Sequence, residues 1–194
     1  ISIVGTTKPL VSGVRVTPAY AAGFAKIVSP NTQPALRTAI PTCGWRLAGL
    51  EITGTQPAVS IQYGLVWLGD GGWAGGGETQ TSLAVVPRDF LLSHLFIHGS
   101  PTLTLQRCLN LNSSHTVLRD SYISDCTIAG TQGQAIAVWN NPGPLLIENN
   151  FISGAGQNLL FGGADPGIAG LIPSDITVRR NHFWKDPAWS RVYT

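Results

Sequence analysis

Five ten-residue segments of this chain share one order of apolar and polar positions. They are residues 45–54 (WRLAGLEITG), 90–99 (FLLSHLFIHG), 116–125 (TVLRDSYISD), 145–154 (LLIENNFISG) and 176–185 (ITVRRNHFWK). Position three is a branched apolar residue in every copy (Leu47, Leu92, Leu118, Ile147, Val178), and position eight is always apolar (Ile52, Ile97, Ile123, Ile152, Phe183). The copies align without a gap at spacings of 45, 26, 29 and 31 residues. This predicts one repeated unit, a strand with a turn at its end, whose copies are joined by loops of different length.

A second pattern lies between these copies. Residues 63–70, 106–113, 134–141 and 156–163 are apolar in the middle and end on Gly, Asn, Asp or Ser. Each coil therefore has at least two short strands, which excludes a helical repeat. All copies run in the same direction, so strands of successive coils should pair in parallel, about 4.8 Å apart. The sequence predicts an all-β fold, a right-handed parallel β-helix of about five to six coils.

The two ends of the chain differ from the repeats. Residues 1–28 are rich in Val, Thr and Ile and broken by Gly and Pro, which predicts β segments that lead into a solenoid at residues 29–194. PAYAAGFA at residues 18–25 favours a brief helix with proline at its first position. Residues 34–38 resemble the second strand of an imperfect first coil. The chain has no methionine and ends soon after a repeat, so we expect a piece of a longer solenoid without its C-terminal cap.

Composition excludes several classes of partner. Charged residues make up 11% of the chain and the net charge is +2, without a clustered basic face, so nucleic acid is not an expected partner. No run of 18 apolar residues is present, which argues against a membrane span. No cluster of acidic or other ligand residues predicts a metal site, and no motif names a cofactor.

The three cysteines are odd in number and lack CxxC spacing. We therefore expect three free, mostly buried thiols that behave as small hydrophobic side chains. The alternative is a Cys108–Cys126 pair, if adjacent coils bring these two residues together.

Asn150 and Asn181 occupy the same position, six, of neighbouring copies. This resembles the asparagine ladder of right-handed parallel β-helix proteins, the pectate-lyase-like superfamily. The phrases SYISDC, QAIAVWNNPGP, GAGQNLLFGGADP and PSDITVRRNHFWK are similar to bacterial secreted β-helix proteins of unassigned activity, and the likeness covers residues 25–191. The resemblance implies a secreted or cell-envelope protein. The superfamily includes polysaccharide lyases, hydrolases and epimerases, adhesins and tailspike-type proteins, so fold alone does not choose a function.

Position seven follows the amides and is mostly aromatic. If positions three, six and eight point inward, position seven points outward. Its residues are Glu51, Phe96, Tyr122, Phe151 and His182. Stacked at the inter-strand spacing, these rings would form either an external aromatic ladder or a platform for sugar.

Positions four and five carry most of the polar side chains of the repeats. Position four contributes Arg119, Glu148 and Arg179, and position five contributes His94, Asp120, Asn149 and Arg180. In a glycan-cleaving enzyme, proton transfer would fall to His94, Asp120 or Glu148, while Arg119, Arg179 and Arg180 would hold substrate carboxylates. Strict alternation turns position five inward, so this site requires the strand to bend there. The alternative is an ion-pair ladder that keeps neighbouring coils in register.

Two Gly-rich connections complete the hypothetical site. They place Asp70, Trp73 and Asp165 in loops that would wall the groove and contact substrate. The catalytic signatures of polygalacturonases and pectate lyases are absent from the sequence, so whether the protein is an enzyme stays open. The working hypothesis is a secreted β-helix protein that binds a polysaccharide or oligosaccharide, with cleavage left open. The rival hypothesis is a non-catalytic structural or adhesive scaffold that associates through uncapped solenoid ends.

Overall fold

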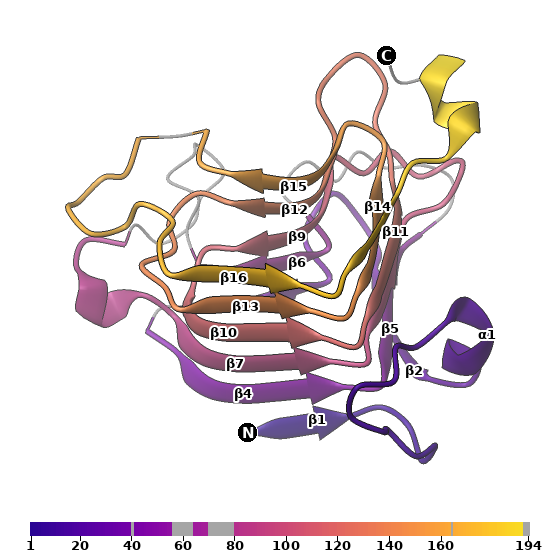
Figure 1. Ribbon diagram of the computed structural model, residues 1–194, viewed down its shortest axis with the longest axis horizontal. Coiled ribbons are helices and arrows are strands. Elements are labelled where there is room, and N and C mark those ends of the chain that lie inside the picture. The colour runs from indigo at the N-terminus through magenta and orange to yellow at the C-terminus, as the bar shows by residue number, and fades with distance from the viewer. Residues whose placement is uncertain (40, 56–63, 70–79, 164, 192–194) are drawn as a thin grey trace.

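A computed structural model describes residues 1–39, 41–55, 64–69, 80–163 and 165–191. Within these residues the strands form three parallel sheets, which we call sheets A, B and C (Figure 1). The chain visits the three sheets in turn, so hydrogen-bonded neighbours in a sheet lie three strands apart in the sequence. The molecule is a parallel β-helix of five to six coils, which confirms the fold class predicted from the repeats.

Each sheet stacks one strand per coil. Sheet A contains β1 (Ser2–Val4), β4 (Cys43–Ala48), β7 (Arg88–Ser93), β10 (Ser114–Arg119), β13 (Leu145–Glu148) and β16 (Ile176–Arg179). Sheet B contains β2 (Ala25–Ser29), β5 (Leu50–Gly54), β8 (Phe96–His98), β11 (Tyr122–Cys126), β14 (Phe151–Gly154) and β17 (His182–Trp184). Sheet C contains β3 (Leu36–Arg37), β6 (Val66–Leu68), β9 (Arg107–Leu111), β12 (Gln134–Val138) and β15 (Gln157–Phe161).

Helical structure in the described chain is limited to one short α-helix, α1 (Pro18–Ala21), and two 3₁₀ segments, η1 (Leu83–Val85) and η2 (Pro187–Arg191). Helix α1 begins where the sequence predicts it. Proline occupies its first turn, and the Thr17 hydroxyl accepts a hydrogen bond from the Tyr20 N–H at 3.2 Å. No helix in the described ranges has the length and hydropathy needed to cross a bilayer.

Each ten-residue repeat forms two strands in different sheets, not the single strand predicted from the pattern. The break falls at position five, where φ is positive in every copy: 61° at Gly49, 53° at His94, 55° at Asp120, 54° at Asn149 and 57° at Arg180. One residue in the left-handed region turns the chain from sheet A into sheet B. The bend that an outward position five requires is therefore present in all five copies.

The predicted apolar columns have the predicted register. At position three, Leu47 pairs with Leu92, Leu92 with Leu118, Leu118 with Ile147, and Ile147 with Val178. Position eight pairs Ile52, Ile97, Ile123, Ile152 and Phe183 in the same manner. The expectation of burial fails only in the last coil, where Val178 is 38% and Phe183 45% exposed. Both lie on strands at the edge of their sheets, without a further described strand to cover them.

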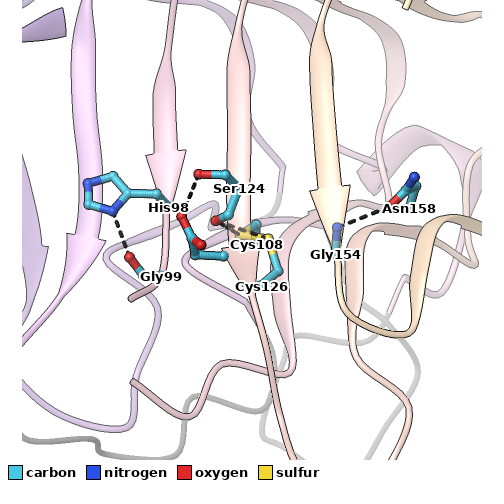
Figure 2. The surroundings of a disulfide bond; sticks show 8 residues. His98, Gly99, Cys108, Ser124, Cys126, Gly154 and Asn158 are labelled. Carbon is cyan, nitrogen blue, oxygen red and sulfur yellow. Dashed lines mark hydrogen bonds between the residues drawn. A yellow bond between two sulfur atoms is a disulfide. The ribbon is translucent and has the colours of Figure 1, made fainter. Parts of the chain in front are cut away.

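The cysteines correct another expectation. Cys108 and Cys126 form a disulfide, with Cα atoms 5.6 Å apart, and both are completely buried (Figure 2). Cys43 is free and exposed, so the prediction of three free thiols is wrong and the alternative, a Cys108–Cys126 pair, is confirmed. Cys108 lies on β9 and Cys126 at the end of β11. These strands belong to different sheets of successive coils, and their side chains meet inside the solenoid, a closeness that cysteine spacing alone does not reveal.

Candidate functional site

The corner between sheets A and B has an inner side built from position six. The Asn150 side chain donates from Nδ2 to the Asn181 Oδ1 at 3.0 Å and to the Leu118 carbonyl at 3.1 Å. Asn181 donates to the Ile147 carbonyl at 2.8 Å. In the preceding coil, the Ser121 N–H donates to the Asn150 Oδ1 at 2.9 Å. The predicted amide ladder is present, with Asn150 buried and Asn181 partly buried.

The outer side of the same corner is built from position five. We call His94, Asp120, Asn149 and Arg180 the corner row. His94 is 5% exposed and Asp120 2% exposed, and the His94 Nε2 lies 3.8 Å from the Asp120 Oδ2. The sequence predicted these groups side by side, and the structure brings them together. The structure also covers His94 and Asp120, because the N-terminal part of the chain lies across the corner.

The covering segment is an insertion at this corner in the first coil. Strands β1 and β2 pair with β4 and β5, so Gly5 takes position five and Ala25 position six. The Gly5 N–H donates to the Ala48 carbonyl at 3.0 Å, and the Ala25 N–H donates to the Gly5 carbonyl at 2.6 Å. Residues 6–24 leave and return between these two neighbours. We call them the strap; they include α1, which lies outside the solenoid beside β2 and β5 (Figure 1).

The strap is held to the corner row mainly through its own backbone. The His94 Nε2 lies 3.0 Å from the Val11 carbonyl oxygen. The Gly13 N–H donates to the Asp120 carboxylate at 3.1 Å, and the Asn149 amide donates to the Gly13 carbonyl at 3.0 Å. These contacts join residues 83 to 136 positions apart in the sequence.

Arg15 is the strap side chain that enters the row. Its guanidinium donates to the Asn149 backbone carbonyl at 3.1 Å, the Asn149 Oδ1 at 3.3 Å and the Arg180 carbonyl at 3.1 Å. Burial lowers the pKa of Arg15, and the charge of Asp120 opposes that shift. The acceptors of the corner row therefore match a cationic, donor-rich group.

Apolar packing fixes the rest of the strap. Val16, Ala21 and Phe24 form a small buried cluster with partly buried Leu10, against the outward rings of Phe96 and Tyr122. None of these strap residues belongs to the main core, which lies inside the three sheets. The strap is thus a separate layer on the outside of the β-helix.

The position-four row contains the alternating charges seen in the sequence. Arg119, Glu148 and Arg179 are in register on adjacent strands. Glu148 binds two arginines through one oxygen, the Arg179 Nε at 3.0 Å and the Arg180 Nη2 at 2.8 Å. The Arg119 Nε lies 3.9 Å from Asp120. This geometry is that of the ion-pair alternative, while a role in substrate binding stays a prediction.

An open groove of about 450 Å³ crosses the outer face of sheet A, and we call it the sheet A groove. It is lined by His115, Thr116, Val117, Pro144, Leu145, Leu146, Asp175, Thr177 and Arg179. Of the predicted site residues in the described chain, Arg179 alone lines it. His115, Asp175 and Thr177 were not predicted as site residues, and all three are exposed.

A signal for two of these missed residues exists in the sequence. The residue before each repeat is Gly44, Asp89, His115, Pro144 or Asp175. Four of these five have positive φ, and before Pro144 the positive φ falls on Gly143. This column of turn-forming residues marks the second corner of the coil, where sheet A begins.

Of the two loops predicted to wall the groove, the one that contains Asp165 lies within the described residues. Asp165 is exposed in the connection from β15 to β16, which enters sheet A at the start of β16. Arg179 and Arg180 stand at the other end of that strand, so the structure does not bring Asp165 to the corner row. Asp70 and Trp73 lie outside the described residues.

The position-seven side chains form an aromatic ladder on the outside of sheet B. Tyr122 and Phe151 stack at 4.2 Å with an interplanar angle of 8°, while Phe96–Tyr122 and Phe151–His182 meet edge to face at 5.8 and 5.1 Å. Burial, followed by the charge of Asp125, raises the pKa of Tyr122. Stacked rings cover each other's faces, which are the surfaces a sugar would need, so this geometry favours the packing interpretation.

No group of three or more His, Cys, Asp or Glu side chains in the described part of the chain could hold a metal ion. Comparisons with protein-family models, with the curated proteins and with solved structures found no match to this chain.

Proposed function

We propose that this protein is a secreted, pectate-lyase-like β-helix that binds an acidic polysaccharide in the sheet A groove without cleaving it. The observation that carries the proposal is the groove itself, an open channel of about 450 Å³ across three adjacent strands. Three parallel strands span about 10 Å, enough for a short stretch of an extended chain. The amide ladder at position six supports the likeness to the pectate-lyase-like superfamily.

The lining of the groove suits a sugar acid. Arg179 is exposed on β16 and its Nε pairs with Glu148, so its two terminal Nη groups are the donors that would bind a carboxylate with two parallel hydrogen bonds. Half-buried Val117 and Leu146 offer apolar surface to the carbon faces of the sugar. His115, Asp175 and Thr177 surround them with exposed donors and acceptors for hydroxyl groups.

The burial and the ion pairing of the predicted proton-transfer groups favour binding over cleavage. His94 and Asp120 are buried beneath the strap, and Glu148 is paired with two arginines. Hydrolysis of a glycosidic bond ordinarily needs two carboxyl groups flanking that bond. Among the described residues that line the groove, Asp175 contributes the one carboxylate.

The Cys108–Cys126 disulfide supports a location outside the cytosol. Structural disulfides persist mainly in secreted and periplasmic proteins. This agrees with a protein that meets polysaccharide at or beyond the cell surface.

The test is binding followed by an assay for cleavage. A glycan array identifies ligands, and calorimetry with uronate oligosaccharides then compares the wild type with Arg179→Gln. We expect at least a tenfold loss of affinity, since one charge-assisted contact contributes about 1.5–3 kcal/mol. Arg180 still pairs with Glu148 in this variant, so the carboxylate keeps a partner.

The matched control is Arg46→Gln, another exposed arginine on sheet A, located on β4. It should leave affinity unchanged. Equal affinity for wild type and an Arg179→Gln, His115→Asn double variant would reject the groove. Release of unsaturated product from a bound uronate would show that the protein is a lyase and reject the non-catalytic proposal.

The rival function, a structural or adhesive scaffold, is favoured by the edge strands of the last coil. Val178, Phe183 and Trp184 are 38%, 45% and 48% exposed on β16 and β17. An exposed apolar strand edge is a template for pairing with another strand. A molar mass that rises with protein concentration, and is restored to that of a monomer by Val178→Lys, together with no glycan binding, would favour the scaffold.

A further inference from the structure

The corner row recognises the strap chiefly as a peptide backbone. His94 contacts the Val11 carbonyl, Asp120 accepts the Gly13 N–H, and Asn149 donates to the Gly13 carbonyl. A further backbone bond joins the Val16 N–H to the Asp120 carbonyl at 3.0 Å. The path turns at Ser12 and Gly13, where the Val14 N–H donates to the Val11 carbonyl at 3.0 Å. Such contacts fit any peptide that makes the same turn, because every residue except proline supplies an N–H and a carbonyl.

Two strap residues add sequence specificity. Gly13 has φ of 83°, a conformation that a residue with a side chain rarely adopts, although no atom would obstruct a Cβ there. Arg15 stands two residues later and places its guanidinium on three oxygen atoms of Asn149 and Arg180. The recognised feature is therefore a Gly-x-Arg segment that turns at its glycine.

The strap has hydrogen bonds and apolar packing of its own. The Lys8 Nζ donates to the Tyr20 and Ala22 carbonyls at 2.7 and 2.5 Å, closing the C-terminal end of α1. The apolar cluster of the strap is separate from the main core. Lifting the strap would therefore expose the corner row and the outer rings without opening the interior of the solenoid.

We propose that the corner row is a binding groove for a Gly-x-Arg peptide of a partner protein that turns at its glycine, and that the strap is its intramolecular occupant. This site is distinct from the sheet A groove and does not depend on glycan binding. A tethered occupant has an effective concentration on the order of millimolar. A peptide in trans then binds only to the fraction of molecules whose strap has left the row.

The test uses a labelled peptide with the sequence of residues 10–17, LVSGVRVT, and fluorescence anisotropy. The receptor is the full chain with a weakened strap, Gly13→Val with Arg15→Ala. We expect this variant to bind the peptide at least tenfold more tightly than the wild type does. A peptide with alanine in place of arginine should bind the same variant at least tenfold more weakly, and adding Asn149→Gly to the receptor should also weaken binding.

The weakened variant must retain the circular dichroism of the wild type for this comparison. If it retains the fold and binds neither peptide, or binds both equally, the proposal is wrong. If the weakened variant fails to fold, the proposal is tested by hydrogen exchange of the wild-type protein with added peptide. Excess LVSGVRVT should accelerate exchange of the Gly13 and Val16 amides while leaving β10 protected, and unchanged exchange would overturn the proposal.

Discussion

Positions five and six of the repeat adjoin in sequence and share one corner, yet their side chains meet different parts of the molecule. At position six, Asn150 bonds to Asn181 and to the coils on either side. At position five, His94 and Asp120 bond to Val11 and Gly13 of the strap. The inner contacts join copies of one repeat, whereas the outer contacts join the repeat to a segment that has no copy.

This difference separates the contacts that stabilise the fold from the contacts that can be lost at its surface. Inside, Ser121 and Asn150 are completely buried, so losing a partner leaves an unsatisfied donor or acceptor. Outside, many strap residues are exposed, and water can replace the lost partners. Changes to the inner side should therefore lower global stability, while changes to the outer side should act mainly on the strap.

The largest effect should come from the inner apolar column. Ile123→Ala removes a completely buried side chain between Ile97 and Ile152, and we expect the free energy of unfolding to fall by about 2–5 kcal/mol. Denaturant titration measures this loss. Val117→Ala, on the half-buried outer face of β10, is the control and should cost much less. Equal losses would show that the inner column is not the main source of stability.

The next effect concerns the disulfide inside the solenoid. Cys108 and Cys126 close a loop with a sequence separation of 18 residues, and replacing both by alanine should cost about 2–4 kcal/mol. The measurement is the denaturant midpoint of the variant and of the reduced and oxidised wild type. Reduction should reproduce most of the loss. An oxidised protein that reacts with three equivalents of a thiol reagent after unfolding would show that the bond does not form.

A smaller loss should follow Asn150→Leu, even though leucine adds apolar surface. The change removes the acceptor of the Ser121 N–H and the side-chain donor to Asn181 and to the Leu118 carbonyl, while the backbone N–H of residue 150 still reaches Asn181, and we expect a cost of about 1–3 kcal/mol. The control is the neighbouring residue, Asn149→Gly, which retains the positive φ and loses the side-chain contacts to the strap and to Asp120. It should accelerate hydrogen exchange at Gly13 with little change in global stability. The reverse ranking would contradict the division between inner and outer sides.

The sequence allowed the inner side to be predicted because a repeat places equivalent residues in equivalent positions. Both apolar columns and the pairing of Asn150 with Asn181 follow from aligning the copies. The corner itself was harder, since a single residue with positive φ is a general property of Gly and Asn but is unusual for His94 or Arg180.

The strap could not be predicted in this manner. Gly13 and Arg15 lie in a segment without a copy, and their partners are more than a hundred residues away. The members of the corner row could therefore be predicted, but not the strap that covers His94 and Asp120, and the role of the row as a site stays a prediction. In the sheet A groove, Arg179 is the one lining residue that was predicted. Cys108 and Cys126 illustrate the same limit, because their closeness depends on the angle between two sheets and not on their spacing.

The smallest expected effect concerns Glu51, an outward position-seven residue of the early coils. Burial alone would raise the pKa of its carboxyl group, but hydrogen bonds and charges from Lys26, at 2.8 Å, and His98, at 3.2 Å, outweigh burial and leave the pKa below the ordinary 4.5. A carboxyl group with a lowered folded pKa contributes stability above its unfolded pKa, and this is lost as pH falls through the folded value. The difference in unfolding free energy between wild type and Glu51→Gln should thus be constant near pH 7 and shrink below about pH 4.5. Lys26→Gln should reduce this pH-dependent part, and a difference that stays constant down to pH 3 would show that Glu51 is not stabilised by its two partners.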